Sequence, residues 1–305
     1  MTRIVAIGEC MVEMAPVAIE GQLRLGYAGD TLNTAWYLRR LLGAGDQIDY
    51  FTAVGIDAIS DKMLVFLQDA GIGTDFILRR DNKSVGLYLI QLQEGERSFS
   101  YWRSDSAART LAADLVSLQA ALNGAGFAYF SGITLAILPP TDRFRFLTVL
   151  RRFRSAGGIV VFDTNLRPKL WASPDEMTQA VMHAAAVSDI VLPSYDDEAK
   201  WFGDDSPEAT LKRYAAAHVG CCIVKNGSGR ILACDGGQRT ICDPVQDVTL
   251  VDSTAAGDSF NAGFIAARLQ GENLHAAVQA GSSLAAQVIA KFGALVDVDV
   301  ARVVD

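Results

Sequence analysis

The most informative stretch of the chain is the segment from 252 to 264, which reads Asp252-Ser253-Thr254-Ala255-Ala256-Gly257-Asp258-Ser259-Phe260-Asn261-Ala262-Gly263-Phe264. It follows a strand-like piece at 248–251 and leads into a helix expected over 259–269. Small residues directly before a helix let an anion approach the free backbone N–H groups of the first turn, where the helix dipole adds a positive potential. The pattern therefore predicts a site for a phosphate, or for a phosphoryl group during transfer.

Asp258 lies at the start of this expected helix. A carboxylate beside a bound anion is repulsive, unless it is there to take a proton. A general base that deprotonates an attacking hydroxyl next to a transferring phosphoryl group fits this position. The alternative is that Asp258 only caps the helix.

Outward from this segment, short apolar runs alternate with amphipathic stretches along the whole chain. Continuous apolar strands that alternate with helices predict an α/β fold, with a central, mostly parallel sheet and helices on both faces. Ligands bind at the carboxyl ends of the strands in such sheets. The expected strands are 4–7, 49–54, 127–131, 159–163, 190–192 and 221–225, and the expected helices are 31–42, 60–70, 113–122, 140–153, 174–185 and 207–216.

One region has the period of an exposed hairpin instead. Residues 86–93 and 97–103 alternate with a period of two around Glu94-Gly95-Glu96, which places Phe99, Tyr101 and Arg103 on one face. We expect one domain over residues 1–305, with a small β-sheet lid formed by inserted segments at about 10–28 and 85–104. The alternative role for the hairpin is an oligomer contact.

Composition excludes several classes of protein. The 305 residues are 50% hydrophobic and carry a net charge of -8, which argues against disorder and against a nucleic-acid partner. No run reaches the roughly 18 apolar residues of a membrane span, and the N-terminal segment is too short and too acidic for a signal peptide. The five cysteines are odd in number and match no zinc pattern, which predicts reduced core thiols in a cytoplasmic protein.

The segment from Asp252 to Asp258 resembles the Asp-Thr-x-Gly-Ala-Gly-Asp signature of the ribokinase-like (PfkB) carbohydrate kinases. Two positions depart from the signature, Thr to Ser and Gly to Ala, and both keep small residues. The resemblance implies a ribokinase-like fold and Asp258 as the catalytic base. It also implies that the backbone amides of Ala255, Ala256 and Gly257 stabilise the transferring phosphoryl group.

The resemblance covers essentially the whole chain. The opening Gly8-Glu9-Cys10-Met11-Val12-Glu13 is similar to that of such kinases, and Gly29-Asp30-Thr31-Leu32-Asn33-Thr34 resembles the family segment Gly-Gly-Asp-x-x-Asn, with Ala28 in place of the first Gly. That segment binds sugar hydroxyls, which implies substrate contacts for Gly29, Asp30 and Asn33. An Asp and an Asn one turn apart can also offer acceptors and an amide to a polyol, and the alternative is N-capping by Asp30.

A further set of motifs is similar to the 2-keto-3-deoxygluconate kinases within this family. The resemblance implies that Tyr88, Tyr101, Arg103 and Arg167 surround an acidic sugar. A planar guanidinium suits a carboxylate, whereas a neutral sugar would gain little from it. The alternatives are a solvated lid charge for Arg103 and a structural ion pair for Arg167. The motifs are Gly86-Leu87-Tyr88, Gly95-Glu96-Arg97, Tyr101-Trp102-Arg103, Ser131-Gly132-Ile133 and Asp163-x-Asn165-x-Arg167-Pro168-x-Leu170-Trp171.

The nucleotide side shows no P-loop motif. The family places ATP near the Gly-rich turn after 221–225, where Lys225 could neutralise phosphate charge or simply lie in solvent. The family's Asn-x-x-Glu motif for Mg²⁺ is changed to Ser194-Tyr195-Asp196-Asp197, so Asp197 or the next residue, Glu198, is the metal candidate, acting through water. The expected cofactor-binding residues are Asn165, Ser194, Lys225, Gly227, Ser228 and Gly229.

The resemblance thus implies ATP-dependent phosphorylation of 2-keto-3-deoxygluconate at its 6-hydroxyl, giving 2-keto-3-deoxy-6-phosphogluconate. It implies Mg²⁺ as cofactor, leaves a role for K⁺ open, and favours a homodimer. The alternatives are a kinase for another sugar such as fructose, against which Tyr101 and Arg103 argue, and a non-catalytic sugar-binding protein, against which Asp258 argues.

Overall fold

The computed structural model describes residues 2–17, 19, 21–93 and 96–304. Its centre is an eight-stranded sheet in the order β14-β13-β12-β11-β10-β9-β1-β4. The six strands from β12 to β4 run parallel, and β13 pairs antiparallel with both β12 and β14. Their bounds are β1 Arg3–Ile7, β4 Gln47–Phe51, β9 Phe127–Ser131, β10 Ile159–Asp163, β11 Ile190–Val191, β12 Cys221–Val224, β13 Ile231–Asp235 and β14 Gln238–Cys242.

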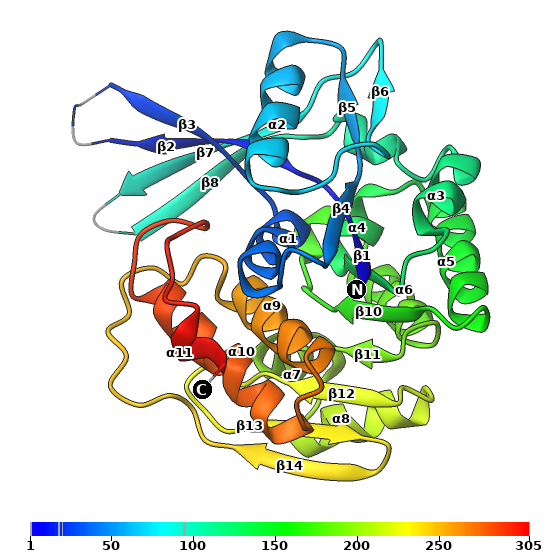
Figure 1. Cartoon of the computed structure of the whole chain (residues 1–305), viewed down its shortest axis with the longest axis vertical. Helices are drawn as coiled ribbons and strands as arrows, with labels where there is room; N and C mark the ends of the chain where they lie inside the picture. The colour runs from blue at the N-terminus through cyan, green and yellow to red at the C-terminus, as the bar shows by residue number, and fades with distance from the viewer. Residues whose placement is uncertain (1, 18, 20, 94–95, 305) are drawn as a thin grey trace.

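Helices cover both faces of this sheet, which confirms the expected α/β fold (Figure 1). Strand β1 shows why: Ile4 and Ala6 belong to one apolar core, and Val5 and Ile7 to the other. A strand that is apolar at every position needs cover on both sides. The first core is closed by α1 (Asp30–Leu41), α2 (Ala58–Asp69), α9 (Ala256–Leu269) and α10 (Leu274–Ile289); the second is closed by α3 (Leu115–Leu122), α5 (Pro140–Ser155), α6 (Pro174–Ala185) and α8 (Pro207–Ala216).

Helices α9 and α10 lie side by side at very close range (Figure 1). A Cβ at Gly263 would lie 2.7 Å from the Ala280 carbonyl oxygen, and one at Gly281 would lie 2.8 Å from the Phe260 carbonyl oxygen. Only glycine permits this approach, because any side chain would meet backbone. The packing fixes the axis of α9, and therefore the direction in which its N-terminus points.

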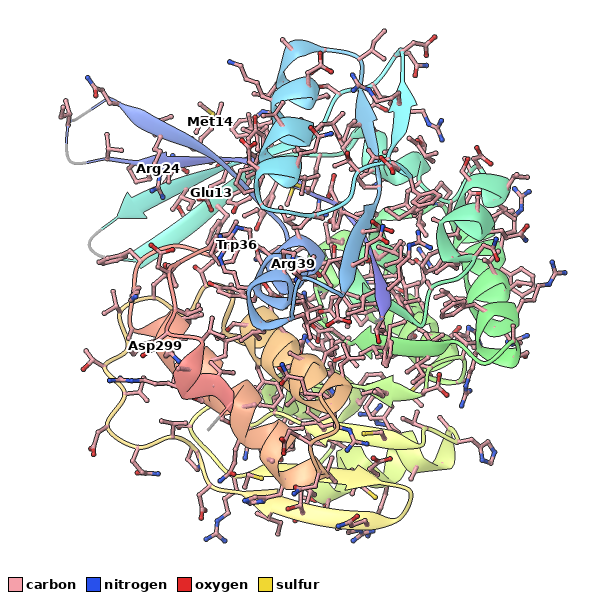
Figure 2. The ribbon with its side chains drawn as sticks, viewed as in Figure 1. Glu13, Met14, Arg24, Trp36, Arg39 and Asp299 are labelled. Atoms are coloured by element: carbon pink, nitrogen blue, oxygen red, sulfur yellow. The ribbon has the colours of Figure 1, made fainter. Side chains whose placement is uncertain are left out.

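A second, four-stranded sheet has the order β3-β2-β7-β8 and projects beside the main body (Figure 1). Its strands are β2 (Met11–Pro16), β3 (Leu23–Ala28), β7 (Gly86–Gln93) and β8 (Glu96–Trp102). Figure 2 places Glu13, Met14 and Arg24 on this sheet and Trp36 on α1. We call it the small sheet.

The two faces of the small sheet differ. The inner face carries Met11, Ala28, Tyr88 and Ile90, which pack with Ala294 and with the loop before α9. On the outer face, Tyr27 contacts Phe66 of α2, with ring centroids 5.2 Å apart.

Most expected elements are confirmed, and several coincide with the observed bounds, among them β9, β10, α6 and α8. The expected strand 49–54 is divided, because β5 (Ala53–Gly55) leaves the central sheet and pairs with β6 (Leu78–Arg80). The expected strand at 248–251 was wrong, since Val251 and Asp252 donate their N–H groups to the Ile289 carbonyl instead of to a strand. The remaining elements are η1 Ala107–Thr110, α4 Gly132–Ile137, η2 Pro168–Leu170, α7 Tyr195–Phe202 and α11 Ala301–Val304.

The five cysteines are free, and four of them are buried. Within the described part of the chain, no helix is both long enough and apolar enough to cross a bilayer.

Candidate active site

Residues of the candidate site gather at the carboxyl edge of the central sheet. Glu9 follows β1, Asp163 ends β10 and Lys225 follows β12, while α1 and α9 begin at the same edge with Asp30 and Ala256. Parallel strands end at one edge, so residues far apart in the sequence meet there.

Asp258 is the third residue of α9, which begins at Ala256 and thus three residues earlier than the sequence pattern suggested. Ala255 precedes the helix in the left-handed conformation, with φ of 60°, and no side chain caps the helix start. Asp258 is therefore not a capping residue. Its Oδ2 accepts a hydrogen bond from Asn33 Nδ2 at 2.8 Å, and its carbonyl oxygen accepts one from Thr34 Oγ1 at 3.1 Å.

The surroundings of Asp258 favour its protonated form. Loss of water and the negative charges of Asp30 and Asp163 raise the pKa of the carboxyl, the Asn33 hydrogen bond and Lys225 lower it, and the net result is a pKa of about 8. A carboxyl with a raised pKa is a stronger base than an ordinary one once it is deprotonated.

Asp30 contacts Asn165, whose Nδ2 donates to Asp30 Oδ2 at 2.8 Å. Asp30 Oδ1 accepts from the adjacent Thr31 N–H, and Gly29 rather than Asp30 precedes the helix as its N-cap. Burial raises the pKa of Asp30. Asn165 was expected on the nucleotide side; in the structure it contacts the residue expected to bind sugar.

The loop before α9 is shaped by Asp252. Its Oδ1 accepts hydrogen bonds from the N–H and Oγ1 of Thr254 at 3.1 and 2.7 Å, and its Oδ2 accepts from the Gly293 N–H at 2.8 Å. One of the three predicted amides is used inside this loop, because the Ala256 N–H donates to the Ser253 carbonyl at 3.2 Å. The amides of Ala255 and Gly257 have no such backbone acceptor in the described chain, so they are the ones that can meet an anion.

Lys225 is buried with 8% exposure, so it is not the solvated lysine of the alternative interpretation. Its Nζ donates to Asp163 Oδ1 at 3.2 Å and to Asn261 Oδ1 at 3.1 Å. A Cβ added to Gly257 would lie 3.6 Å from this Nζ, so the ammonium lies next to the α9 N-terminus. The Gly-rich turn at 227–229 begins two residues further on, and Gly227 takes a left-handed φ of 51°.

The metal candidates separate clearly. Asp197 lies near the half-exposed Arg167, with Oδ2 3.7 Å from Nη1, and burial raises the pKa of its carboxyl against the opposing charge of Arg167. Glu198 is fully buried, and it pairs with Arg213 at 2.7 Å and accepts from Tyr214 Oη at 3.0 Å. Because its oxygens are taken up inside the protein, Glu198 is not available to a metal ion. Ser194 precedes α7, and its backbone forms an isolated parallel β-bridge with that of Lys225.

Three of the four expected acid-binding residues, Tyr88, Tyr101 and Arg103, lie along and just beyond the small sheet, whereas Arg167 lies in the loop after β10, beside Asp197. Tyr88 and Tyr101 are cross-strand neighbours with ring centroids 5.9 Å apart. Tyr88 Oη donates to the buried Glu13 carboxylate, and the Arg103 guanidinium lies 5.9 Å from the Tyr101 ring. Arg103 also pairs with the buried carboxylate of Glu9.

Sequence reasoning missed several residues that complete the site: Asp163, Asn261, Tyr129 and Glu13. Asn261 Nδ2 donates to Tyr129 Oη at 3.1 Å, and Thr34 Oγ1 lies 3.0 Å from the same oxygen. These contacts connect Lys225 to α1 through Asn261 and Tyr129. Asp163 carried a usable signal, an acidic residue at the end of an apolar strand. Tyr129 gave none, because an aromatic residue inside a strand is typical of a core.

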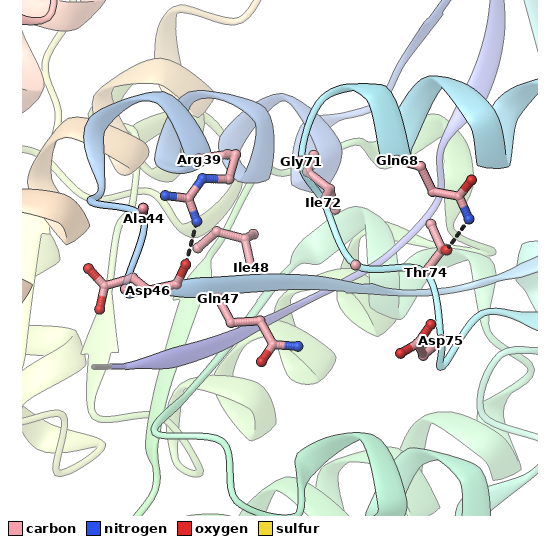
Figure 3. Close-up of a pocket in the computed structure, with 12 residues that line it drawn as sticks. Arg39, Ala44, Asp46, Gln47, Ile48, Gln68, Gly71, Ile72, Thr74 and Asp75 are labelled. Atoms are coloured by element: carbon pink, nitrogen blue, oxygen red, sulfur yellow. Dashed lines mark hydrogen bonds between the residues drawn. The ribbon is translucent and has the colours of Figure 1, made fainter.

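A separate hollow of about 860 Å³ contains none of these residues (Figure 3). It lies at the amino end of β4, where Arg39 contacts the Asp46 carbonyl and Gln68 Nε2 donates to Thr74 Oγ1 at 2.9 Å. The site residues follow the carboxyl ends of the strands, so this hollow is not part of their site.

Known proteins resemble this chain over nearly its full length. Residues 1–300 match the family described as pfkB family carbohydrate kinase. The 2-dehydro-3-deoxygluconokinases of Dickeya dadantii and Haemophilus influenzae are 40% and 39% identical, over 97% of this chain and 97% and 96% of theirs. A fructokinase from Xylella fastidiosa with bound ATP superposes with a TM-score of 0.83 at 22% identity, over 96% of this chain and 93% of its own. The chain belongs to the pfkB family of carbohydrate kinases.

Proposed function

We propose that this sugar kinase transfers the γ-phosphoryl group of ATP to the 6-hydroxyl of 2-keto-3-deoxygluconate, also called 2-dehydro-3-deoxygluconate. The observation that carries the proposal is the position of the Asp258 carboxyl, in the first turn of α9 and hydrogen-bonded to Asn33. The relatives at about 40% identity, named 2-dehydro-3-deoxygluconokinases, support this substrate over a neutral sugar.

In the proposed reaction, deprotonated Asp258 accepts the proton of the sugar hydroxyl as the oxygen attacks the γ-phosphorus in line, and ADP leaves. The amides of Ala255 and Gly257 and the Lys225 ammonium would stabilise the charge on the transferring group. Gly29, Asp30 and Asn33 would orient the sugar, so that the attacking oxygen lies near the base.

We propose that the small sheet is a lid on a single domain and that it recognises the acid end of the substrate. Tyr88, Tyr101 and Arg103 come from its strands and their ends, and Arg167 would approach from the loop after β10. Three carboxylates near the sugar, on Glu9, Asp30 and Glu13, would repel a sugar acid without a cation to bind it. A closed lid would also exclude water, which competes as acceptor.

ATP would bind along Lys225 and the turn at 227–229, with Ser194 and Asn165 at its edge. The donor set fits Mg²⁺, since Asp197 offers a partly exposed carboxylate and this ion keeps waters and binds phosphates alongside one or two carboxylates. No cluster of three Asp, Glu, His or Cys suited to a metal occurs among the described residues. Bound Mg²⁺ would neutralise phosphate charge. The proposal needs no K⁺.

We propose that two copies of the chain pair through the outer face of the small sheet. Leu23, Leu25 and Trp102 share this face and are 44%, 47% and 59% exposed, an apolar group that is costly to leave in water. We also propose a cytoplasmic location, which the five free cysteines support.

The substrate is tested by an ADP-release assay with Mg·ATP and a panel of sugars. The panel holds 2-keto-3-deoxygluconate, 2-keto-3-deoxygalactonate, gluconate, fructose and ribose. We expect turnover of the keto-deoxy acids alone. Turnover of fructose or ribose at a comparable kcat/KM would reject the proposed substrate and leave the role of Asp258 intact.

We expect Asp258→Asn to keep the fold and to lower kcat by roughly 10²–10⁴, because the amide cannot accept the hydroxyl proton. Steady-state kinetics with 2-keto-3-deoxygluconate measures the loss, and circular dichroism checks the fold. A variant with kcat within threefold of the parent would remove Asp258 as the base.

The raised pKa of Asp258 predicts a rate that increases with pH. The base works only when deprotonated, so kcat/KM should rise about tenfold per unit below the pKa and level off near pH 8. The same pKa shift makes the stability of the protein depend on pH. Because the folded protein favours protonated Asp258, the contribution of this residue to the free energy of unfolding is lost as pH rises from about 4 to 8. Asp258→Asn should therefore exceed the parent in Tm by more at pH 8 than at pH 5. A kcat/KM profile that is flat from pH 5 to 8 would contradict the assignment of Asp258 as the base.

We expect Arg103→Ala to cost about 1.5–3 kcal/mol in kcat/KM for the keto acid, because a charge-assisted hydrogen bond is lost. Any slow turnover of a neutral sugar should barely change. Equal losses on both substrates would argue that Arg103 supports the lid and does not bind the carboxylate.

We expect Trp102→Asp to convert a dimer to a monomer, because a charge on the outer face opposes burial of that face. Sedimentation velocity of the parent and the variant measures this, with Val116→Asp, a substitution at an exposed position on α3, as the control. A parent that sediments as a monomer, or a variant that stays dimeric, would reject the proposed interface.

A further inference from the structure

Glu9 is a buried carboxylate that the proposed reaction does not use. It follows β1 at the edge where the site lies, and it is 1% exposed. One oxygen, Oε1, accepts a hydrogen bond from Ser106 Oγ, and the other, Oε2, is in ionic contact with Arg103 Nη2. Burial raises the pKa of Glu9, and the Arg103 charge opposes the shift.

The Arg103 guanidinium is held by Glu9 inside the protein. Nη2 is in direct ionic contact with Glu9 Oε2. The side chain is 10% exposed, and Nε and Nη2 have almost no accessible surface, so the exposed part lies on its other atoms. A planar guanidinium held at one side keeps its orientation, and it can bind a carboxylate through its remaining donors.

The absence of a side chain at Gly86 leaves space for the Glu9–Arg103 pair. A Cβ on Gly86 would lie 2.9 Å from Glu9 Oε1 and 3.2 Å from Arg103 Cβ. Without Glu9, the guanidinium would be a buried cation with no counter-ion before substrate arrives, and it would be driven toward solvent or toward another carboxylate.

We infer that Glu9 is a positioning residue for substrate recognition: its carboxylate holds the Arg103 guanidinium at the base of the small sheet, in the orientation in which Arg103 binds the carboxylate of the sugar acid. This inference rests on the proposed function. Glu9 itself does not touch the substrate, so its effect on catalysis passes through Arg103.

Glu9→Gln tests the inference, because it keeps the shape of the side chain and removes its charge. We expect the KM for 2-keto-3-deoxygluconate to rise about tenfold with kcat within threefold, since a displaced guanidinium weakens binding and leaves the reacting atoms in place. In an Arg103→Ala background the same change should alter KM by less than twofold. An unchanged KM in the single variant, or effects of Glu9→Gln and Arg103→Ala that simply multiply, would overturn the inference.

Asp49→Asn is the matched control. Asp49 is also a buried carboxylate paired with an arginine at 2.6 Å, but it lies in the middle of β4, and its partner Arg3 lies at the amino end of β1. We expect it to lower Tm and leave KM unchanged. A tenfold rise in KM in this control as well would mean that loss of any buried pair disturbs the site, which would overturn the specific role of Glu9.

Should Glu9→Gln fail to fold, Ser106→Ala loosens the same carboxylate through its other oxygen. It should raise KM about threefold at unchanged kcat, and no change would count against the inference. Failure of the proposed function is distinguishable, because the parent enzyme would then release no ADP with the keto acid. An active parent with an unaffected Glu9→Gln variant would reject only the role of Glu9.

Discussion

The site depends on keeping carboxylates away from bulk water at the edge of a parallel sheet. Asp258, Asp30 and Asp163 are close enough for their charges to raise the pKa of Asp258 together with the loss of water. Negative charges collected in this way are unstable unless donors and cations surround them. The side-chain amides of Asn33 and Asn165 and the Lys225 ammonium supply those partners. Asp258 keeps a raised pKa in these surroundings and can accept a proton.

The positive side of the site comes from three separate sources. The α9 N-terminus supplies backbone amides, Lys225 supplies a buried ammonium, and Arg103 supplies a guanidinium from the small sheet. Each source suits a different anionic group, because amides and ammonium ions match phosphoryl oxygens while a guanidinium edge matches a carboxylate. The arrangement therefore favours a substrate with an acid at one end and a reacting hydroxyl at the other.

The two sheets differ in how they contact the rest of the protein. The close contact of α9 with α10 at Gly263 and Gly281 holds the base and the amides at a fixed place. The small sheet contacts the main body through a few apolar residues, among them Ala28 and Ala294. Closure of the proposed lid would therefore leave the reacting groups on α9 in place.

The sequence by itself determined the layer architecture, the hairpin at 86–103 and the position of Asp258 at the start of a helix, because these follow from local periodicity and from a contiguous motif. It could not determine that Glu198 turns inward to Arg213, that the Ala256 amide is used within its own loop, or that 248–251 is not a strand. Those outcomes depend on partners far along the chain. Only the tertiary structure decided them, since it sets which hydrogen-bonding partner each buried group finds.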